Sequence, residues 1–188
     1  MFEVNEFDAL SEGIELGGLR NKDEIRVLIG YLLKTVDSPI SREQIGNIMQ
    51  DQGIANYFEA MDAISELLSN GNVTSTFQDE KELLTITDIG RAAIATLEQD
   101  LPRTVREKAV KSAIRFMTLE KNERENEVKI EPTSDGYTIS FSLKDRDSSM
   151  MDLSMFVPDK EQAERLKANF VEDPARVYSS ILAALMIK

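Results

Sequence analysis

Residues 43–80, EQIGNIMQDQGIANYFEAMDAISELLSNGNVTSTFQDE, decide the fold of the N-terminal half. At their start, Ser41 and Gln44 form a helix-capping signature, and the apolar residues that follow recur at helical spacing. Another helix, the third of the chain, is predicted from Ala55 to Leu68, because apolar residues again share one face and a Ser-Asn-Gly stop follows. Short β-type runs on both sides of Gln78–Lys81 then indicate a hairpin.

The segments that flank this stretch are also helical. Asn21 and Glu24 form a capping pair, and the apolar residues from Ile25 to Val36 then follow the i, i+3, i+4, i+7 spacing of an amphipathic helix. After the hairpin, Thr87 caps a fourth helix. Pro102 interrupts the helical pattern, so it either kinks one long helix or opens a new one at its first turn.

The last third of the chain changes to the period of two that is typical of strands with one buried face. The alternating runs are Val128–Ile130, Tyr137–Leu143 and Met151–Val157. Asp135-Gly136 and Lys144–Ser149 supply turns, so we expect an antiparallel meander. Asp159 and the pair Asp173-Pro174 then begin two closing helices.

The three helices and the hairpin between residues 21 and 86 resemble a winged-helix domain, a form of helix-turn-helix. Leu67-Leu68-Ser69-Asn70-Gly71-Asn72-Val73 looks like the turn from helix to wing. Leu84-Thr85-Ile86-Thr87-Asp88-Ile89-Gly90-Arg91 looks like the L-T-x-x-G signature that follows the wing in many bacterial regulators. Over its full length the chain resembles a bacterial family of undetermined function, domain of unknown function 4364, which joins such a winged helix to a C-terminal αβ domain.

The pattern and the resemblance together predict an α+β fold, with the order α-α-α-β-β-α-α followed by β-β-β-α-α. The expected parts are an acidic N-terminal arm (1–20), a winged-helix domain (21–101), a linker or dimerisation helix (102–125) and a C-terminal antiparallel β-β-β-α-α domain (126–188).

The resemblance implies that the third helix, Ala55–Leu68, enters the major groove of DNA and that the wing, Phe77–Leu83, touches the backbone or the minor groove. The side chains then expected to read bases are Asn56, Tyr57 and Ser65, with Glu59 as a further candidate. The expected phosphate anchors are Arg42, Lys81 and a basic cluster after Pro102 that comprises Arg103, Arg106, Lys108, Lys111 and Arg115.

The charge of the same region opposes DNA binding. Residues 43–80 contain seven acids and no lysine or arginine, a net charge of −7, and such a surface repels phosphates. Residues 1–100 carry 7 bases and 19 acids, whereas residues 101–188 carry 15 of each, so the net charge of −12 lies entirely in the first half. The third helix is therefore as consistent with a role in packing and protein contact as with a role in reading DNA bases.

Two functions remain open. The first is a homodimeric winged-helix transcriptional regulator that binds double-stranded DNA and carries a C-terminal sensing or assembly domain. The second is a protein-interaction module that does not bind DNA and whose acidic third helix recognises a basic protein. An apolar stripe of Val110, Ala113, Ile114 and Met117 is expected to pack on the second domain or on the same helix of a second subunit. The basic residues on the opposite side of the same helix have a plainer interpretation as a solvated helix face.

Catalysis is not expected, because the chain has no histidine and no cysteine. Their absence removes the usual general base near neutral pH, the commonest transition-metal ligand and every thiolate nucleophile. No catalytic, cofactor-binding or metal site is predicted, since Asp145–Ser149 fails the calcium-loop template and the glycines lack phosphate-loop spacing. One group of residues is interpreted either as sheet packing or as the lining of an effector pocket: Met150, Met151, Met155, Tyr137, Phe141 and Phe156.

The sequence predicts a cytoplasmic protein with no membrane partner. Met1–Leu10 is acidic where a signal peptide requires a basic start and an apolar core. The longest apolar run, Ile181–Ile187, is far shorter than the roughly 20 residues that a bilayer-spanning helix requires.

Overall fold

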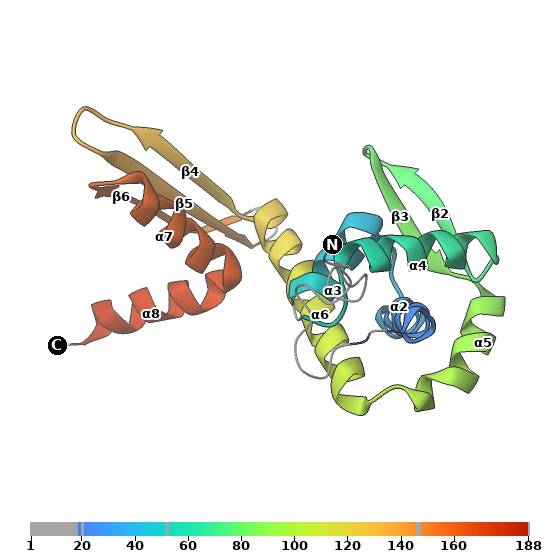
Figure 1. Cartoon of the computed structure of the whole chain (residues 1–188). Helices are drawn as coiled ribbons and strands as arrows, with labels where there is room; N and C mark the ends of the chain where they lie inside the picture. Colours follow the sequence, from blue (N-terminus) through green and yellow to red (C-terminus); the bar gives the residue numbers. More distant parts are fainter. Residues whose placement is uncertain (1–18, 20, 52, 146–147, 188) are drawn as a thin grey trace, which may run out of the picture. The chain divides into compact units, whose positions relative to one another are not determined.

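Figure 1 shows the chain as a computed structural model that describes residue 19 and residues 21–51, 53–145 and 148–187. Within these residues it is a mixed α+β protein with seven α-helices and two three-stranded antiparallel sheets. The chain divides into two compact units, one up to Phe116 and one from Met117. Of the arm expected over residues 1–20, all but Leu19 lies outside the described residues.

The first unit is built around one central helix. Its elements are α2 (Lys22–Val36), β1 (Ile40–Ser41), α3 (Arg42–Asp51), α4 (Tyr57–Ser69), β2 (Val73–Gln78), β3 (Lys81–Ile86), α5 (Asp88–Leu97), the 3-10 turn η1 (Glu98–Asp100) and the start of α6 (Arg103–Glu125). Figure 1 looks along α2, with α4, α5 and α6 around it. Ile25, Leu28, Ile29 and Leu32 are fully buried, as the predicted apolar stripe requires.

Local capping starts α3 and α6 where the sequence indicates. The Gln44 backbone N–H donates to Ser41 Oγ at 3.1 Å, and the Ser41 N–H donates to Gln44 Oε1 at 2.8 Å, so the predicted capping box is complete. Pro102 opens a new helix rather than kinking a long one. Its carbonyl oxygen accepts from the Val105 and Arg106 N–H groups at 3.1 and 3.2 Å, and α6 begins at the next residue.

The first sheet has the order β1-β3-β2, and its outer strand β1 was not predicted. Ile40 and Ser41 pair with Leu84 and Leu83, and this two-residue strand is too short to show a period of two. The predicted hairpin is confirmed, because Gln78 pairs with Lys81. The two turn residues between them both have positive φ, as a type I′ turn requires.

The Thr87-x-x-Gly90 motif ties the hairpin to the helices. The Asn72 carbonyl oxygen accepts from the Thr87 N–H at 3.0 Å and from Thr87 Oγ1 at 3.1 Å. The same hydroxyl oxygen accepts from the Gly90 N–H at 3.1 Å, which caps α5. A Cβ on Gly90 would overlap the Asn72 carbonyl oxygen, so glycine is required for this close approach. The Thr and Gly of this regulator-like motif therefore each have a structural role in joining the hairpin to α5.

The second unit contains the predicted meander and the two closing helices. Its elements after α6 are β4 (Glu127–Pro132), β5 (Tyr137–Asp145), β6 (Ser148–Val157), α7 (Lys160–Glu172) and α8 (Pro174–Met186), and its sheet has the order β4-β5-β6. The turn is shorter than Lys144–Ser149, because these two residues already pair. The core contains Phe141 of β5 against Phe170 of α7, with ring centroids 4.9 Å apart.

The residues interpreted either as sheet packing or as the lining of an effector pocket do not all lie on one face of this sheet. Tyr137, Phe141, Met151 and Met155 lie in register on one face of the sheet. Phe156 pairs with Thr138, so it points to the opposite face of the sheet, where it is 58% exposed, and Met150 is the unpaired residue of a β-bulge and is 47% exposed. No described helix is both long and apolar enough to cross a bilayer.

Replacing Gly90 with Ala is expected to destabilise the first unit by about 2 kcal/mol or more, because the added methyl group overlaps a backbone carbonyl. Gly71→Ala is the matched control. The space around Gly71 is open, so only its positive φ is penalised, by about 1 kcal/mol. Urea unfolding followed by circular dichroism measures both losses, and equal losses would contradict the close contact at Gly90.

Candidate functional site

Helix α4, the start of α3 and the hairpin β2–β3 together form one surface of the first unit, which we term the α4–hairpin surface. Helix α4 buries Ala60, Ala63, Ile64 and Leu67 in the core of the first unit. Its exposed residues are Phe58, Asp62, Ser65 and Ser69, spaced four, three and four apart on the opposite face. This face carries no base.

The side chains expected to read bases have structural roles. The Asn56 side chain caps α4 by accepting from the Phe58 N–H at 2.8 Å. The half-buried Tyr57 ring packs so closely on Gly46 that a Cβ there would overlap it. Ser65 Oγ donates to the Met61 carbonyl oxygen at 2.9 Å. Glu59 is only 6% exposed, so its side chain does not project from the exposed face of α4.

Arg42, the expected phosphate anchor at the start of α3, is held by a carboxylate of the hairpin. Its Nε donates to Glu82 Oε2 at 2.5 Å, and its Nη1 lies 3.3 Å from Ser65 Oγ. Hydrogen bonding to Arg42, and then its positive charge, hold the pKa of the Glu82 carboxyl below the ordinary value of 4.5. A DNA phosphate that approaches Arg42 must compete with this carboxylate.

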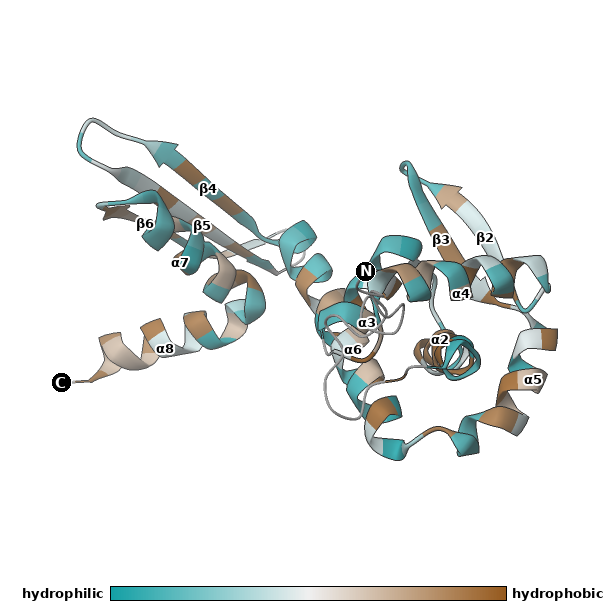
Figure 2. Ribbon diagram, viewed as in Figure 1, coloured by the Kyte–Doolittle hydropathy of each residue, from teal (hydrophilic) through white to brown (hydrophobic). Residues whose placement is uncertain are grey.

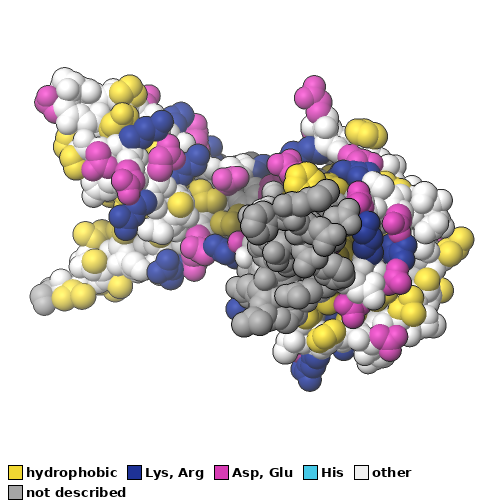
Figure 3. Space-filling model, in the orientation of Figure 1, with side chains coloured by type: hydrophobic (Ala, Val, Ile, Leu, Met, Phe, Trp, Pro, Cys, Tyr) yellow, Lys and Arg dark blue, Asp and Glu magenta, His cyan; other side chains and the backbone are white. Residues whose placement is uncertain are grey.

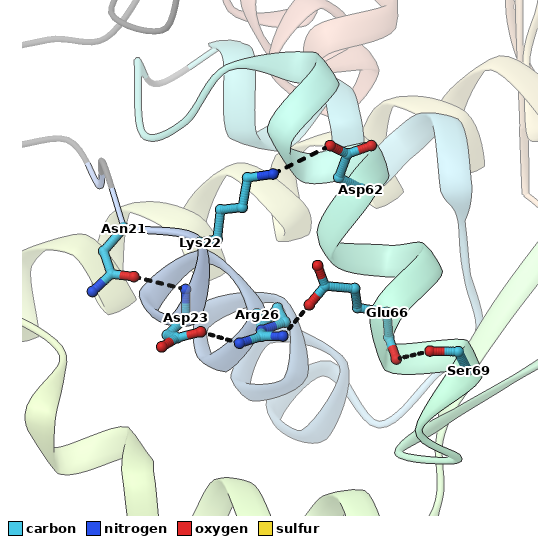
Figure 4. A network of polar contacts seen from close by, with 7 residues as sticks. All are labelled: Asn21, Lys22, Asp23, Arg26, Asp62, Glu66 and Ser69. Atoms are coloured by element: carbon cyan, nitrogen blue, oxygen red, sulfur yellow. Dashed lines mark hydrogen bonds and ion pairs between the residues drawn. The ribbon is translucent and has the colours of Figure 1, made fainter. Parts of the chain in front are cut away.

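Every base between residues 21 and 100 has a partner, Gln52 being the only residue of that range outside the described part. The ion pairs are Lys22–Asp62, Arg26–Asp23, Arg26–Glu66, Lys34–Glu98, Arg42–Glu82 and Arg91–Asp37. Lys81, the expected anchor in the wing, also interacts with a neighbour. Figure 4 shows how Lys22 and Arg26 of α2 reach the α4 carboxylates of Asp62 and Glu66. Five of the six bases between residues 21 and 100 are therefore ion-paired with acids of the same range, and the sixth, Lys81, also has a partner.

A hollow of about 280 Å³ lies within the α4–hairpin surface. Its charged lining comprises Arg42, Lys81, Glu43, Glu80 and Glu82. Glu43 and Glu80 form no ion pair among the described residues, so carboxylates remain available beside the paired Arg42. In the space-filling view, acidic side chains are prominent at the tip of the hairpin (Figure 3).

Two exposed aromatic residues accompany these acids, and the sequence-based interpretation missed them. Phe58 in the first turn of α4 is 76% exposed, and Phe77 near the end of β2 is 77% exposed. Phe77 pairs with Glu82, so both point to the face of the hairpin that also carries buried Leu84 and faces α3. Phe58 lies outside the apolar stripe of α4, and this position in the sequence could have predicted that its side chain is exposed.

The basic cluster of α6 separates into different environments. Arg103 is paired with Glu107 at 2.7 Å. Arg106 is half-buried with its guanidinium 5.5 Å from the Tyr31 ring centroid, so it packs inside the first unit. Lys108, Lys111 and Arg115 are exposed at helical spacing, so these three bases share a solvent-facing side of α6.

Two of the four residues in the apolar stripe of α6, which was expected to pack on the second domain or on a second subunit, pack on the core of the first unit. Ala113 is fully buried and Val110 is packed against the core of the first unit. Ile114 is 58% exposed.

Among the described residues, no group of three or more acids is placed to hold a metal ion.

Comparison with known proteins identifies a protein family, but no individual curated protein or solved structure, that matches this chain. A family model described as Domain of unknown function (DUF4364) matches residues 25–185, which span both units. Neither the curated proteins nor the solved structures contain a match to this chain.

The Arg42–Glu82 pair predicts a specific pH dependence. Because the folded pKa of Glu82 is lowered, its stabilising effect is present above 4.5 and is lost as the pH falls through the lower, folded value. Glu82→Gln is expected to cost about 0.5–1 kcal/mol of unfolding free energy at pH 7, and less as the pH drops below 4.5. Urea titrations across this range, with Glu80→Gln as control, measure the difference. A cost that is the same at pH 7 and pH 3 would rule out this pairing.

Proposed function

The chain belongs to this domain-of-unknown-function family, and because the description assigns no activity, we propose the function from the geometry. We propose that the first unit is a winged-helix module whose α4–hairpin surface binds a basic protein partner in preference to double-stranded DNA. Charge and exposed aromatic residues support this assignment.

The order of elements supports the winged-helix part of the proposal. Three helices, α2, α3 and α4, precede the hairpin β2–β3, and β1 joins the hairpin as a third strand. The exposed face of α4 lies where the resemblance expects the base-reading helix. Since a fold does not determine a function, the chemistry of that face has to decide what it binds.

The observation that carries the proposal is that each described base between residues 21 and 100 has a partner within the chain. A phosphate backbone gains affinity by attracting lysine and arginine side chains, and here it would first have to displace a carboxylate such as Glu82. A lysine or arginine of a partner meets the opposite situation, because Glu43 and Glu80 lie in the same hollow without an ion pair among the described residues.

Phe58 and Phe77 supply the apolar part of such an interface. Large aromatic side chains that become buried at the centre of an interface often dominate its binding energy. Acids around them discriminate between partners and accelerate association with a positively charged surface. Neither aromatic is required by the core, since both are more than three-quarters exposed.

We expect capture of a basic protein from extracts by the full chain, unaffected by nuclease treatment. Its binding should fall at least tenfold in Phe58→Ser/Phe77→Ser, and by about three- to tenfold in Glu43→Gln/Glu80→Gln because the charge attraction is lost. Ile89→Ser is the matched control, since Ile89 is 70% exposed on α5, outside the surface. Titration by fluorescence anisotropy measures each Kd. Binding that survives both double variants would refute the assignment of the surface.

Duplex binding by a homodimeric regulator is the second candidate, and the solvent-facing Lys108, Lys111 and Arg115 of α6 favour it. In this alternative the three bases contact phosphates, and the C-terminal unit senses or assembles. The apolar end of α8 supports assembly, because Leu185 and Met186 are 78% and 81% exposed and hydrophobic residues continue to the end of the helix (Figure 2).

The two candidates differ in their response to salt. Under the first proposal, the full chain shows no duplex binding even near 50 mM salt. Under the second, log affinity falls linearly with log salt, and replacing the three α6 bases with Gln lowers the slope by about three. Anisotropy of a labelled random-sequence duplex measures this, with Lys160→Gln/Arg165→Gln on α7 as a control for loss of exposed charge.

A further inference from the structure

We propose that the first unit contains a binding site for a small organic cation with an apolar body, in a cavity separate from the α4–hairpin surface. The cavity has a volume of about 450 Å³ and lies between the first half of α2, the end of α4, and α5 with η1. This volume is within the range of small-molecule sites, roughly 300–1,000 Å³. The inference does not depend on the proposed function.

The wall of the cavity is apolar. Val27, Leu67, Ile94, Leu97 and Leu101 line it, and Ala93 contributes a short side chain that leaves space. Leu97 is 43% exposed although its helix packs on the core through Ile94, so the cavity presents apolar surface to solvent. Covering such surface with the body of a ligand is favourable, at about 25 cal/mol per Å².

The charge of the lining selects a cation. Asp23, Glu24 and Asp100 contribute carboxylates, whereas Arg26 is the one base in the lining. The Arg26 guanidinium is bound by Asp23 and by Glu66, so it is not available to an anion (Figure 4). Glu24 and Asp100 are not ion-paired within the part of the chain that the structure describes.

The helix ends provide a second, independent preference for positive charge. The C-terminal ends of α4 and α5 both border the cavity, at Leu67 with Asn70 and at Leu97. A helix C-terminus carries partial negative charge, which lysine or arginine in the last turn often offsets. Neither α4 nor α5 has a basic residue in its last turn. The N-terminus of α2 has the opposite polarity, but Asp23 and Glu24 in its first turn already compensate it.

The geometry gives each part of the ligand a place. The ammonium group would be attracted by the carboxylates of half-buried Glu24 and exposed Asp100, and the apolar body would contact the leucines of the wall. The amides of Asn70 and Asn72 are the remaining polar groups and can bond a second polar atom of the ligand.

Phenylbutylamine, with phenylbutanol and phenylbutyrate as neutral and anionic analogues, tests this site on the full chain by ¹⁵N chemical-shift titration. The amine is expected to bind roughly three- to tenfold more tightly than the alcohol, with the carboxylate weakest, and to shift amides around Asn70, Asn72 and Leu97. Equal affinity for the three probes, or amine-induced shifts confined to other regions, would overturn the proposal.

Two variants separate the contributions of charge and shape. Glu24→Gln/Asp100→Asn is expected to abolish the preference for amine over alcohol, whereas Asp79→Asn/Glu80→Gln at the hairpin tip removes as much charge and retains the preference. Ala93→Phe fills the cavity and is expected to abolish binding of both probes. Retained amine preference in the first variant, or unchanged binding in a folded Ala93→Phe, overturns the site.

Discussion

The burial of α2 is the constraint on which the first unit depends. Ile25, Leu28, Ile29 and Leu32 are fully enclosed by the surrounding helices and the sheet, and each such side chain contributes about 1.5–3 kcal/mol when buried. The ion pairs that α2 makes with α4 lie at its exposed edge, where a pair is worth about 0–1 kcal/mol. Apolar packing therefore holds the helices together, while the ion pairs mainly decide which charges remain available at the surface. That division allows the fold of the first unit to be kept while the charges on its surface change.

Local features of the sequence predicted most of the fold. Apolar spacing predicted the stripe of α2, and the capping box at Ser41 and Gln44 predicted the start of α3, because both depend on residues within one or two turns. The two-residue strand β1 escaped prediction, since it exists only through pairing with β3, some forty residues later. The opposite orientations of Met155 and Phe156 were available from the period of two, and grouping them in one lining disregarded it.

The site was harder to predict from the sequence because, like β1, it depends on contacts between residues that are far apart in the chain. Arg42 and Lys81 were expected to anchor phosphates because they are the bases nearest the third helix, but their partners are set by tertiary structure. Glu82 meets Arg42 only because the hairpin folds back on α3, and that contact converts an expected anchor into an internal pair. Arg106 likewise belongs to a charge run in the sequence and to a packed interior in three dimensions. Charge counts along the chain give the sign of a region, whereas the geometry determines which charges a partner meets.

The bonds between Asn72, Thr87 and Gly90 fasten the hairpin at its base, while its far end is a two-residue turn of Asp79 and Glu80, both in the left-handed region. Amide protons near the base are thus tied into the same cooperative unit as α5, and those at the tip are protected by little beyond their own ladder. Native-state hydrogen exchange should accordingly slow progressively from tip to base. Over evolutionary time the tip can accept substitutions and insertions that alter the surface of the unit, without loss of the fold that carries it.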